Sequence, residues 1–198
     1  MDLFKKSIAF FLLLPTLCFV SARPVANEKY VIDKKESVVT WKGSDMASRG
    51  HAGYVDVSKG ELILEKGQLV GGVVEIDMNT IANELHRSDN NLINHLKSPD
   101  FFDVEKFPVS TFAITEVAPA SGEDIKVTGN LTIKGITLAV TFPANIEVKG
   151  GTVNANGKVT IDRAKWDVRY GSGKFFDNLA DKAISDDIEF EMKIVAKK

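Results

Sequence analysis

The 198-residue chain has a single cysteine, Cys18, and only three histidines, at positions 51, 86 and 95. A histidine binds a metal or transfers a proton beside other ligands or a partner group, and these three do not stand at a standard ligand spacing. H-E-x-x-H, C-x-x-C and G-x-S-x-G motifs are also missing. We therefore predict no metal, no cofactor and no catalytic residue, and we expect His86 and His95 to be structural.

An excess of positive charge is missing as well. The chain has 25 Lys and Arg residues against 27 Asp and Glu residues, a net charge of −2. Nucleic-acid binding needs a basic footprint on the protein. The composition therefore excludes DNA and RNA from the expected partners.

Only one long hydrophobic run is present, at residues 8–20. Two lysines at positions 5–6 precede it, and the small residues Ser21 and Ala22 follow it. The run is short for a transmembrane helix, and its flanks are those of a secretory signal peptide. We predict that residues 1–22 are a signal peptide cleaved after Ala22, so the protein is periplasmic or secreted and has no stable membrane insertion.

A lipoprotein that begins at Cys18 is a weaker interpretation, because Leu17 stands where lipoprotein processing usually needs a small residue. Residues 23–198 are enough for one domain with a substantial core. This remainder keeps 23 basic and 26 acidic residues and no cysteine. Its fold must therefore depend on the core alone, without disulfides.

Eight stretches of the chain alternate apolar and polar residues with period two, most plainly at 136–148 and 187–196. This pattern is typical of half-buried antiparallel strands. It predicts an all-β fold, an eight-stranded antiparallel barrel in meander order with one or two short helices. A barrel of about eight strands has room for one small ligand. The strands are expected at 37–43, 51–65, 69–78, 109–117, 124–133, 136–148, 152–162 and 187–196, and residues 30–32 can form a further short strand.

Glycines mark the joints of this barrel. Lys134-Gly135 and Gly150-Gly151 predict tight hairpin turns, and Gly60 predicts a bulge or bend in the long second strand. Two insertions interrupt the meander, at 79–107 and 163–186. Each can hold a short helix, at 89–96 with Ser88 as its N-cap and at 178–184.

The insertions are rich in aromatic side chains. They carry five of the eight phenylalanines of residues 23–198, together with a tryptophan and a tyrosine: Phe101, Phe102, Phe107, Phe175, Phe176, Trp166 and Tyr170. Such side chains can close a barrel mouth and line an apolar channel, or they can plug the barrel end as ordinary core. Composition alone does not decide between the two.

Basic residues flank Trp166 in the second insertion. Arg163 or Arg169 at the rim of a cavity could bind a phosphate or another polar head group, and Arg49, His51 and Lys174 are similar candidates. The alternative is pairing within the protein, and for the two arginines the expected partners are the nearby acids Asp162, Asp167 and Asp177.

Several longer segments make the chain resemble the YceI-like family of secreted bacterial proteins. They are His51-Ala52-Gly53-Tyr54-Val55, the run 94–103 with Phe107-Pro108, the run 129–135, Ile161-Asp162-Arg163 with Trp166-Asp167-Val168, and the run 170–176. The resemblance implies an extended lipocalin-like barrel that holds a polyisoprenoid, such as a polyprenyl phosphate or a quinone tail. It further implies a periplasmic location, homodimers in some members, and no known catalytic residue. Ala164 departs from the threonine that the family has after this arginine.

We therefore predict an isoprenoid-binding protein for transport or storage, which is not an enzyme. The expected ligand-binding residues are Trp41, His51, Val74, Ile76, Phe101, Phe102, Phe112, Val127, Leu131, Phe142, Arg163, Trp166, Tyr170, Phe175 and Phe176. Two alternatives remain. One is an enzyme acting on a lipidic substrate with His51 as base. The other is an interaction module whose barrel is filled by its own side chains.

Overall fold

The computed structural model describes residues 26–45, 50–83, 90–122 and 124–198. The predicted signal peptide, Ser88 and Arg49 lie outside these residues. The strands are β1 (Glu28–Ile32), β2 (Val38–Ser44), β3 (Gly50–Glu65), β4 (Gln68–Asn83), β5 (Val109–Pro119), β6 (Asp124–Ile133), β7 (Ile136–Lys149), β8 (Thr152–Asp162) and β9 (Asp187–Lys197). One α-helix, α1 (Asn90–Lys97), and two short 3₁₀ helices, Arg163–Trp166 and Ala180–Lys182, complete the described elements.

The strands form a closed antiparallel barrel. From β2 to β9 each strand pairs with the next one in the sequence, and β9 pairs with β2 to complete the circle. The predicted eight-stranded barrel in meander order is therefore confirmed. Closure removes the exposed sheet edges that would otherwise invite aggregation.

β1 and β2 share one position in the barrel wall. Both lie between β3 and β9: β2 pairs with Gly50–Asp56 of β3, and β1 pairs with Glu61–Leu64 of the same strand. Between β1 and β2, the side chain of Ser37 forms the hydrogen bonds to the Val195 backbone that a neighbouring strand would otherwise form. Its hydroxyl accepts a hydrogen bond from the Val195 N–H at 2.9 Å and donates one to the Val195 carbonyl at 3.2 Å.

Ser37→Ala should lower the free energy of unfolding by about 1–3 kcal/mol, because it leaves the buried N–H of Val195 without its acceptor, while the Val195 carbonyl keeps the Asp33 N–H at 2.8 Å. Ser110→Ala is the matched control. Ser110 is equally buried, but its hydroxyl has no hydrogen-bond partner among the described residues, so its loss should cost little. Urea unfolding of both variants tests this, and equal losses of stability would contradict it.

The predicted turns and the bend are confirmed. Lys134-Gly135 and Gly150-Gly151 both have positive φ at each residue, as the two-residue turn that suits a twisted hairpin requires. The pairing of β3 with β4 shifts register between Val57 and Lys59. At the adjacent Gly60, a Cβ atom would collide with the carbonyl of Val73 and the side chain of Ile32. Only glycine therefore allows the wall to bend this sharply.

β7 and β8 pair over only part of their length. Their register runs from Lys149 opposite Thr152 to Ala144 opposite Gly157, yet both strands continue beyond the last pair. We call this gap, between residues 138–143 of β7 and 158–162 of β8, the β7–β8 split. Pro143, which has no N–H to donate, stands at the first missing pair.

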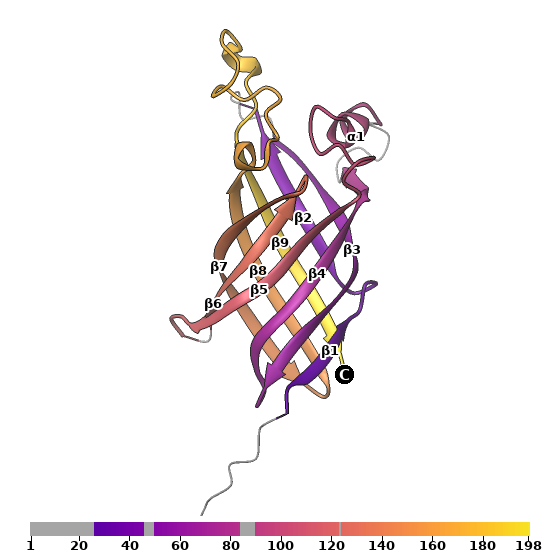
Figure 1. The fold of residues 1–198 in the computed structure, drawn as a ribbon, viewed down its shortest axis with the longest axis vertical. Coiled ribbons are helices and arrows are strands. Elements are labelled where there is room, and N and C mark those ends of the chain that lie inside the picture. Colours follow the sequence, from indigo (N-terminus) through magenta and orange to yellow (C-terminus); the bar gives the residue numbers. More distant parts are fainter. Residues whose placement is uncertain (1–25, 46–49, 84–89, 123) are drawn as a thin grey trace, which may run out of the picture.

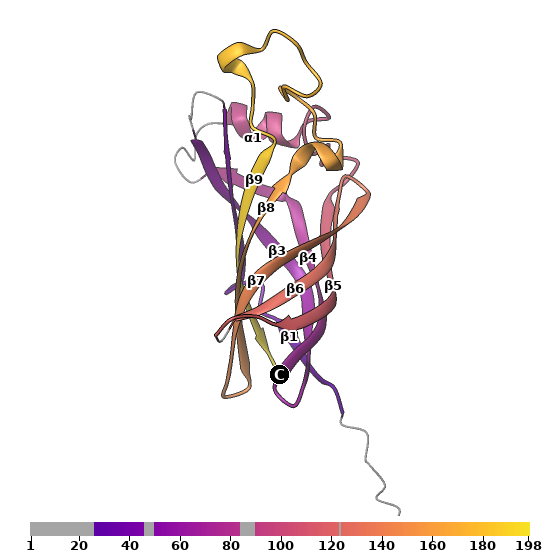
Figure 2. The ribbon, with the colours of Figure 1, turned by 90° about the vertical axis from the view of Figure 1, so that its left-hand side faces the viewer.

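Both insertions lie at the same end of the barrel, where α1 and the segment after β8 project beyond the strands (Figures 1 and 2). α1 confirms the first predicted helix in its described part. The second predicted helix, at 178–184, is wrong in extent, because only Ala180–Lys182 form a 3₁₀ turn. Asn178 and Ala180 have φ values of 61° and 46°, which no α-helix tolerates.

Candidate functional site: the barrel cavity

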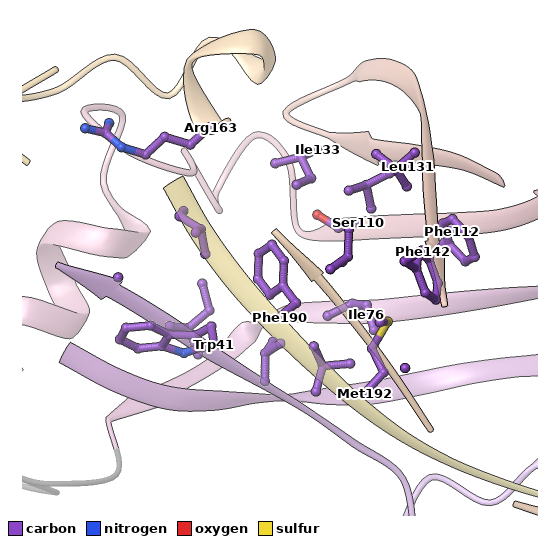
Figure 3. A pocket seen from close by; sticks show the side chains of 18 of the residues that line it. Trp41, Ile76, Ser110, Phe112, Leu131, Ile133, Phe142, Arg163, Phe190 and Met192 are labelled. Carbon is purple, nitrogen blue, oxygen red and sulfur yellow. The ribbon is translucent and has the colours of Figure 1, made fainter. Parts of the chain in front are cut away.

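The barrel encloses a cavity of about 440 Å³. This volume lies in the range of small-molecule sites. The inward faces of the strands supply most of its lining, and Figure 3 shows Trp41, Ile76, Phe190 and Met192 around the same space. Leu92 and Leu96 of α1 cover its end. The cavity is therefore a largely apolar container built by period-two alternation on separate strands.

Eleven of the predicted site residues line this cavity: Trp41, His51, Val74, Ile76, Phe101, Phe102, Phe112, Val127, Leu131, Phe142 and Arg163. Their contact with a ligand stays a prediction. The alternative of a barrel filled by its own side chains is wrong, because this space remains between them.

The other four predicted residues do not line the cavity. Trp166 is 2 % exposed and packs with Ile133 and Ile161 outside it, donating its indole N–H to the carbonyl of Leu131 at 3.1 Å. Tyr170, Phe175 and Phe176 are exposed, and the backbone N–H groups of the two phenylalanines both donate to the carbonyl of Ser172. This tight turn keeps the two phenylalanines on the surface, so they do not close the barrel as lids, whereas the Tyr170 ring packs from outside against His95 and Phe101 of the cavity lining.

Sequence reasoning missed several lining residues. Leu92 and Leu96 stand four residues apart in the predicted helix at 89–96, and the apolar side that they share was the available signal. The inward positions of the last strand gave a clear signal as well. The residues missed there and nearby are Ile184, Ile188, Phe190, Met192 and Ile194.

Few polar groups face the space inside the barrel. Ser110 is one of them, and its hydroxyl has no hydrogen-bond partner among the described residues. The indole N–H of Trp41 is buried and likewise has no partner in the part of the chain that the structure describes. A burial site this poor in polar partners favours hydrocarbon over any charged group.

Arg163 touches the cavity, but its guanidinium is committed elsewhere. It donates hydrogen bonds to the carbonyls of Val168, Ile184 and Ser185 at 2.7, 3.1 and 2.9 Å. Figure 3 shows the group turned away from the labelled apolar side chains. Burial lowers the pKa of the Arg163 guanidinium, and the nearby Asp186 carboxylate opposes this shift. The Arg163 side chain therefore holds the two ends of the 163–186 segment together through hydrogen bonds to its backbone.

The expected pairing partners of the basic residues need one correction. The carboxylate beside Arg163 is that of Asp186, at 3.6 Å, and not one of the three acids nearer in the sequence. The antiparallel pairing of β8 with β9 sets Asp162 opposite Asp187, which makes Asp186 a neighbour of Arg163 although it is distant in the sequence. Arg169 does pair with Asp167, at 2.6 Å, and Lys174 pairs with Asp162 and Asp186.

The cavity opens at the end that carries α1. Exposed His51 and Lys182 lie on its rim, beside the partly exposed Ser44 and Asp45. His51 has no side-chain hydrogen bond or ion pair among the described residues. The same residues contain no cluster of three side chains that could hold a metal ion. The described part of the rim thus offers polar contacts to a ligand.

Comparison with known proteins identifies the family. The sequence model of the YceI-like domain matches residues 30–196. The chain belongs to the YceI-like family. Protein YceI of Salmonella newport is 29% identical over 148 residues, covering 74% of this chain and 75% of that protein. A UPF0312 protein of Enterobacter is 31% identical over 139 residues, covering 69% and 70% of the two chains.

Solved structures share the YceI-like fold. Burkholderia cenocepacia BcnA matches with a TM-score of 0.65 and 24% identity, over 84% of this chain and 99% of that one. A polyisoprenoid-binding domain from Saccharophagus degradans, implicated in plant cell wall breakdown, matches with a TM-score of 0.64 and 14% identity, over 85% and 97%. None of the described helices is long and apolar enough to cross a membrane.

Asp162 fixes the start of the segment that follows β8 in this YceI-like barrel. Its carboxylate accepts hydrogen bonds from the Ala164 N–H at 3.1 Å and from the Lys174 ammonium at 2.9 Å. The Lys174 hydrogen bond is the main reason that the pKa of Asp162 lies below its usual value.

Asp162→Asn should therefore destabilise the protein in a pH-dependent way. A lowered pKa in the folded state stabilises the protein above the unfolded pKa, near 4, and this gain disappears as the pH falls through the folded pKa. Urea unfolding of both proteins from pH 7 to pH 3 should show a difference of at most about 1 kcal/mol at neutral pH that vanishes in acid. Asparagine can still cap the helix, so a difference independent of pH would contradict the ionic role.

Proposed function

We propose that this YceI-like protein binds an isoprenoid lipid, with the hydrocarbon chain inside the barrel and the polar head near the rim. The observation that carries the proposal is the enclosed apolar cavity of about 440 Å³. Burial of each CH₂ group contributes about 0.8 kcal/mol, so an isoprene unit contributes roughly 3 kcal/mol before ordering costs. A few units therefore suffice for tight binding.

The class of ligand is supported by the structural neighbour from Saccharophagus degradans, whose domain is described as polyisoprenoid-binding. A polyprenyl phosphate or a quinone tail fits this description. The predicted signal peptide at residues 1–22 supports a periplasmic site of action, where the protein would carry or store its ligand. His51 is exposed and has no side-chain partner in the described part of the chain, which supports binding instead of catalysis.

Native mass spectrometry of the gently purified protein tests this proposal. We expect a co-purified molecule that organic extraction identifies as an isoprenoid, and saturable binding of added geranylgeraniol and of a polyprenyl phosphate. The same spectra report whether the protein is a homodimer. A preparation without lipid that also fails to bind both added compounds would contradict the proposal.

A further inference from the structure

The β7–β8 split opens a second pocket in the barrel wall. This pocket has a volume of about 180 Å³ and lies between Leu138–Thr141 and Val159–Asp162, with Lys165 and Trp166 at one end. Val140 and Val159 line both this outer pocket and the main cavity. Two valine side chains therefore stand between the interior of the barrel and its side.

The split is a local separation of two strands and not a frayed sheet. β7 stays paired with β6 from Ile136 to Asn145, and β8 stays paired with β9 over its full length. Continuing the register of the paired part would place Thr141 opposite Thr160 and Val140 opposite Ile161, but these pairs are not formed. The wall is therefore open between β7 and β8, and each of these strands remains paired with its other neighbour.

The missing ladder makes this the easiest place to widen the wall. Elsewhere around the barrel, separating neighbouring strands breaks backbone hydrogen bonds. Between residues 138–143 and 158–162 no ladder hydrogen bond has to break, and the two sides are joined instead by the hydrogen bonds of Trp166 to Leu131 and of Lys134 to Asp167. Valine is stiff at χ1, so movement of the strands, and not a change of rotamer, would open the passage.

The surroundings of the split suit a hydrocarbon. Leu138, Val140 and Val159 pack against the buried cluster of Ile133, Ile161 and Trp166. The outer pocket itself is mixed, because Thr141, Thr160, Asp162 and Lys165 line it as well, and its apolar part continues to the cavity through the two shared valines. The loss of hydration on this path costs a charged head group free energy, whereas it costs an alkyl chain none.

We propose that the β7–β8 split is a lateral portal through which the isoprenoid chain enters and leaves the barrel. The proposal rests on the proposed function, since it concerns the same ligand. It assigns the rim at α1 to the polar head and the wall between β7 and β8 to the passage of the hydrocarbon.

A reversible crosslink tests the portal. Thr141→Cys and Thr160→Cys stand opposite each other across the split, and Glu147→Cys and Asn154→Cys form the control pair in the zipped part of the same two strands. The control lies six residues further along each strand. Because hydrogen-bonded and non-hydrogen-bonded pairs alternate along an antiparallel ladder, both cysteine pairs occupy the same type of position. Both pairs are made in the full chain with Cys18→Ser, because Cys18 is its only cysteine. An ethylene bis-methanethiosulfonate joins the thiols where the strands are too far apart for a direct disulfide.

The readout is the quenching of tryptophan fluorescence, from Trp41 in the cavity and Trp166 at the split, by a nitroxide-labelled geranylgeraniol. We expect the crosslinked split to slow uptake and release at least tenfold with an unchanged dissociation constant, and a reductant to restore both rates. Rates within twofold of the control pair, or a change in affinity alone, would overturn the portal. Absence of quenching in the unmodified protein would instead overturn the proposed function, and the portal with it.

Discussion

Arg163→Met is expected to lower the free energy of unfolding by about 3–5 kcal/mol, the usual loss when one partner of a buried ionic network is removed. The Arg163 side chain is 1 % exposed and serves three backbone carbonyls and the carboxylate of Asp186. Methionine fills part of the space but donates no hydrogen bond, so it leaves the three carbonyls without this donor and the Asp186 carboxylate without this cation. Urea unfolding measures the loss.

Two further variants sharpen this test. Arg169→Met removes an exposed arginine from the same segment, together with its ion pair to Asp167, and should cost no more than about 1 kcal/mol. Arg163→Lys should not restore stability, because an ammonium group cannot reach three carbonyls held in the geometry of a guanidinium fork. Stability of Arg163→Met within 1 kcal/mol of the wild type would show that the segment is held by packing alone.

The barrel could be predicted from the sequence because its cause is local. Alternation at 136–148 aims every second side chain inward, and the glycines at 135 and 150–151 permit the positive φ that the turns need. Neither feature depends on a distant part of the chain. The strand positions, the meander and most of the lining residues follow from these local patterns.

The aromatic residues of the insertions show where this reasoning ends. Phe101 and Phe176 occur in similar aromatic pairs, yet Phe101 is 6 % exposed on the cavity and Phe176 is 48 % exposed at the surface. The difference arises from the backbone: the Phe101 N–H donates to Ser98 just after α1, which packs over the barrel end, whereas Phe176 belongs to a turn around Ser172. Composition contains no information about which loop folds inward.

The partner of Arg163 and the β7–β8 split were hidden for a related reason. Asp186 is 23 residues from Arg163 in the sequence, and the pairing of β8 with β9, which sets Asp162 opposite Asp187, brings the two together. The alternation of β7 and β8 continues unchanged through the split, since it records which face is buried and not which strand is adjacent. Pro143 was the one local sign that pairing could stop there.

Val127→Trp should weaken isoprenoid binding about 100-fold. Val127 is 3 % exposed, lines the cavity and lies opposite Phe142 on the adjacent strand. An indole at this position fills space that about one isoprene unit would occupy, and the loss of roughly 3 kcal/mol of burial corresponds to that factor.

Overpacking complicates this variant, because a larger side chain in a packed interior can cost about 1–3 kcal/mol of stability by itself. Lys126→Trp provides the matched control: it places the same side chain one residue away, on the outer face of β6, where it meets solvent. Binding of geranylgeraniol by both variants should be measured beside their urea unfolding. A folded Val127→Trp protein that binds as tightly as Lys126→Trp would mean that the hydrocarbon does not occupy the part of the cavity that Val127 lines.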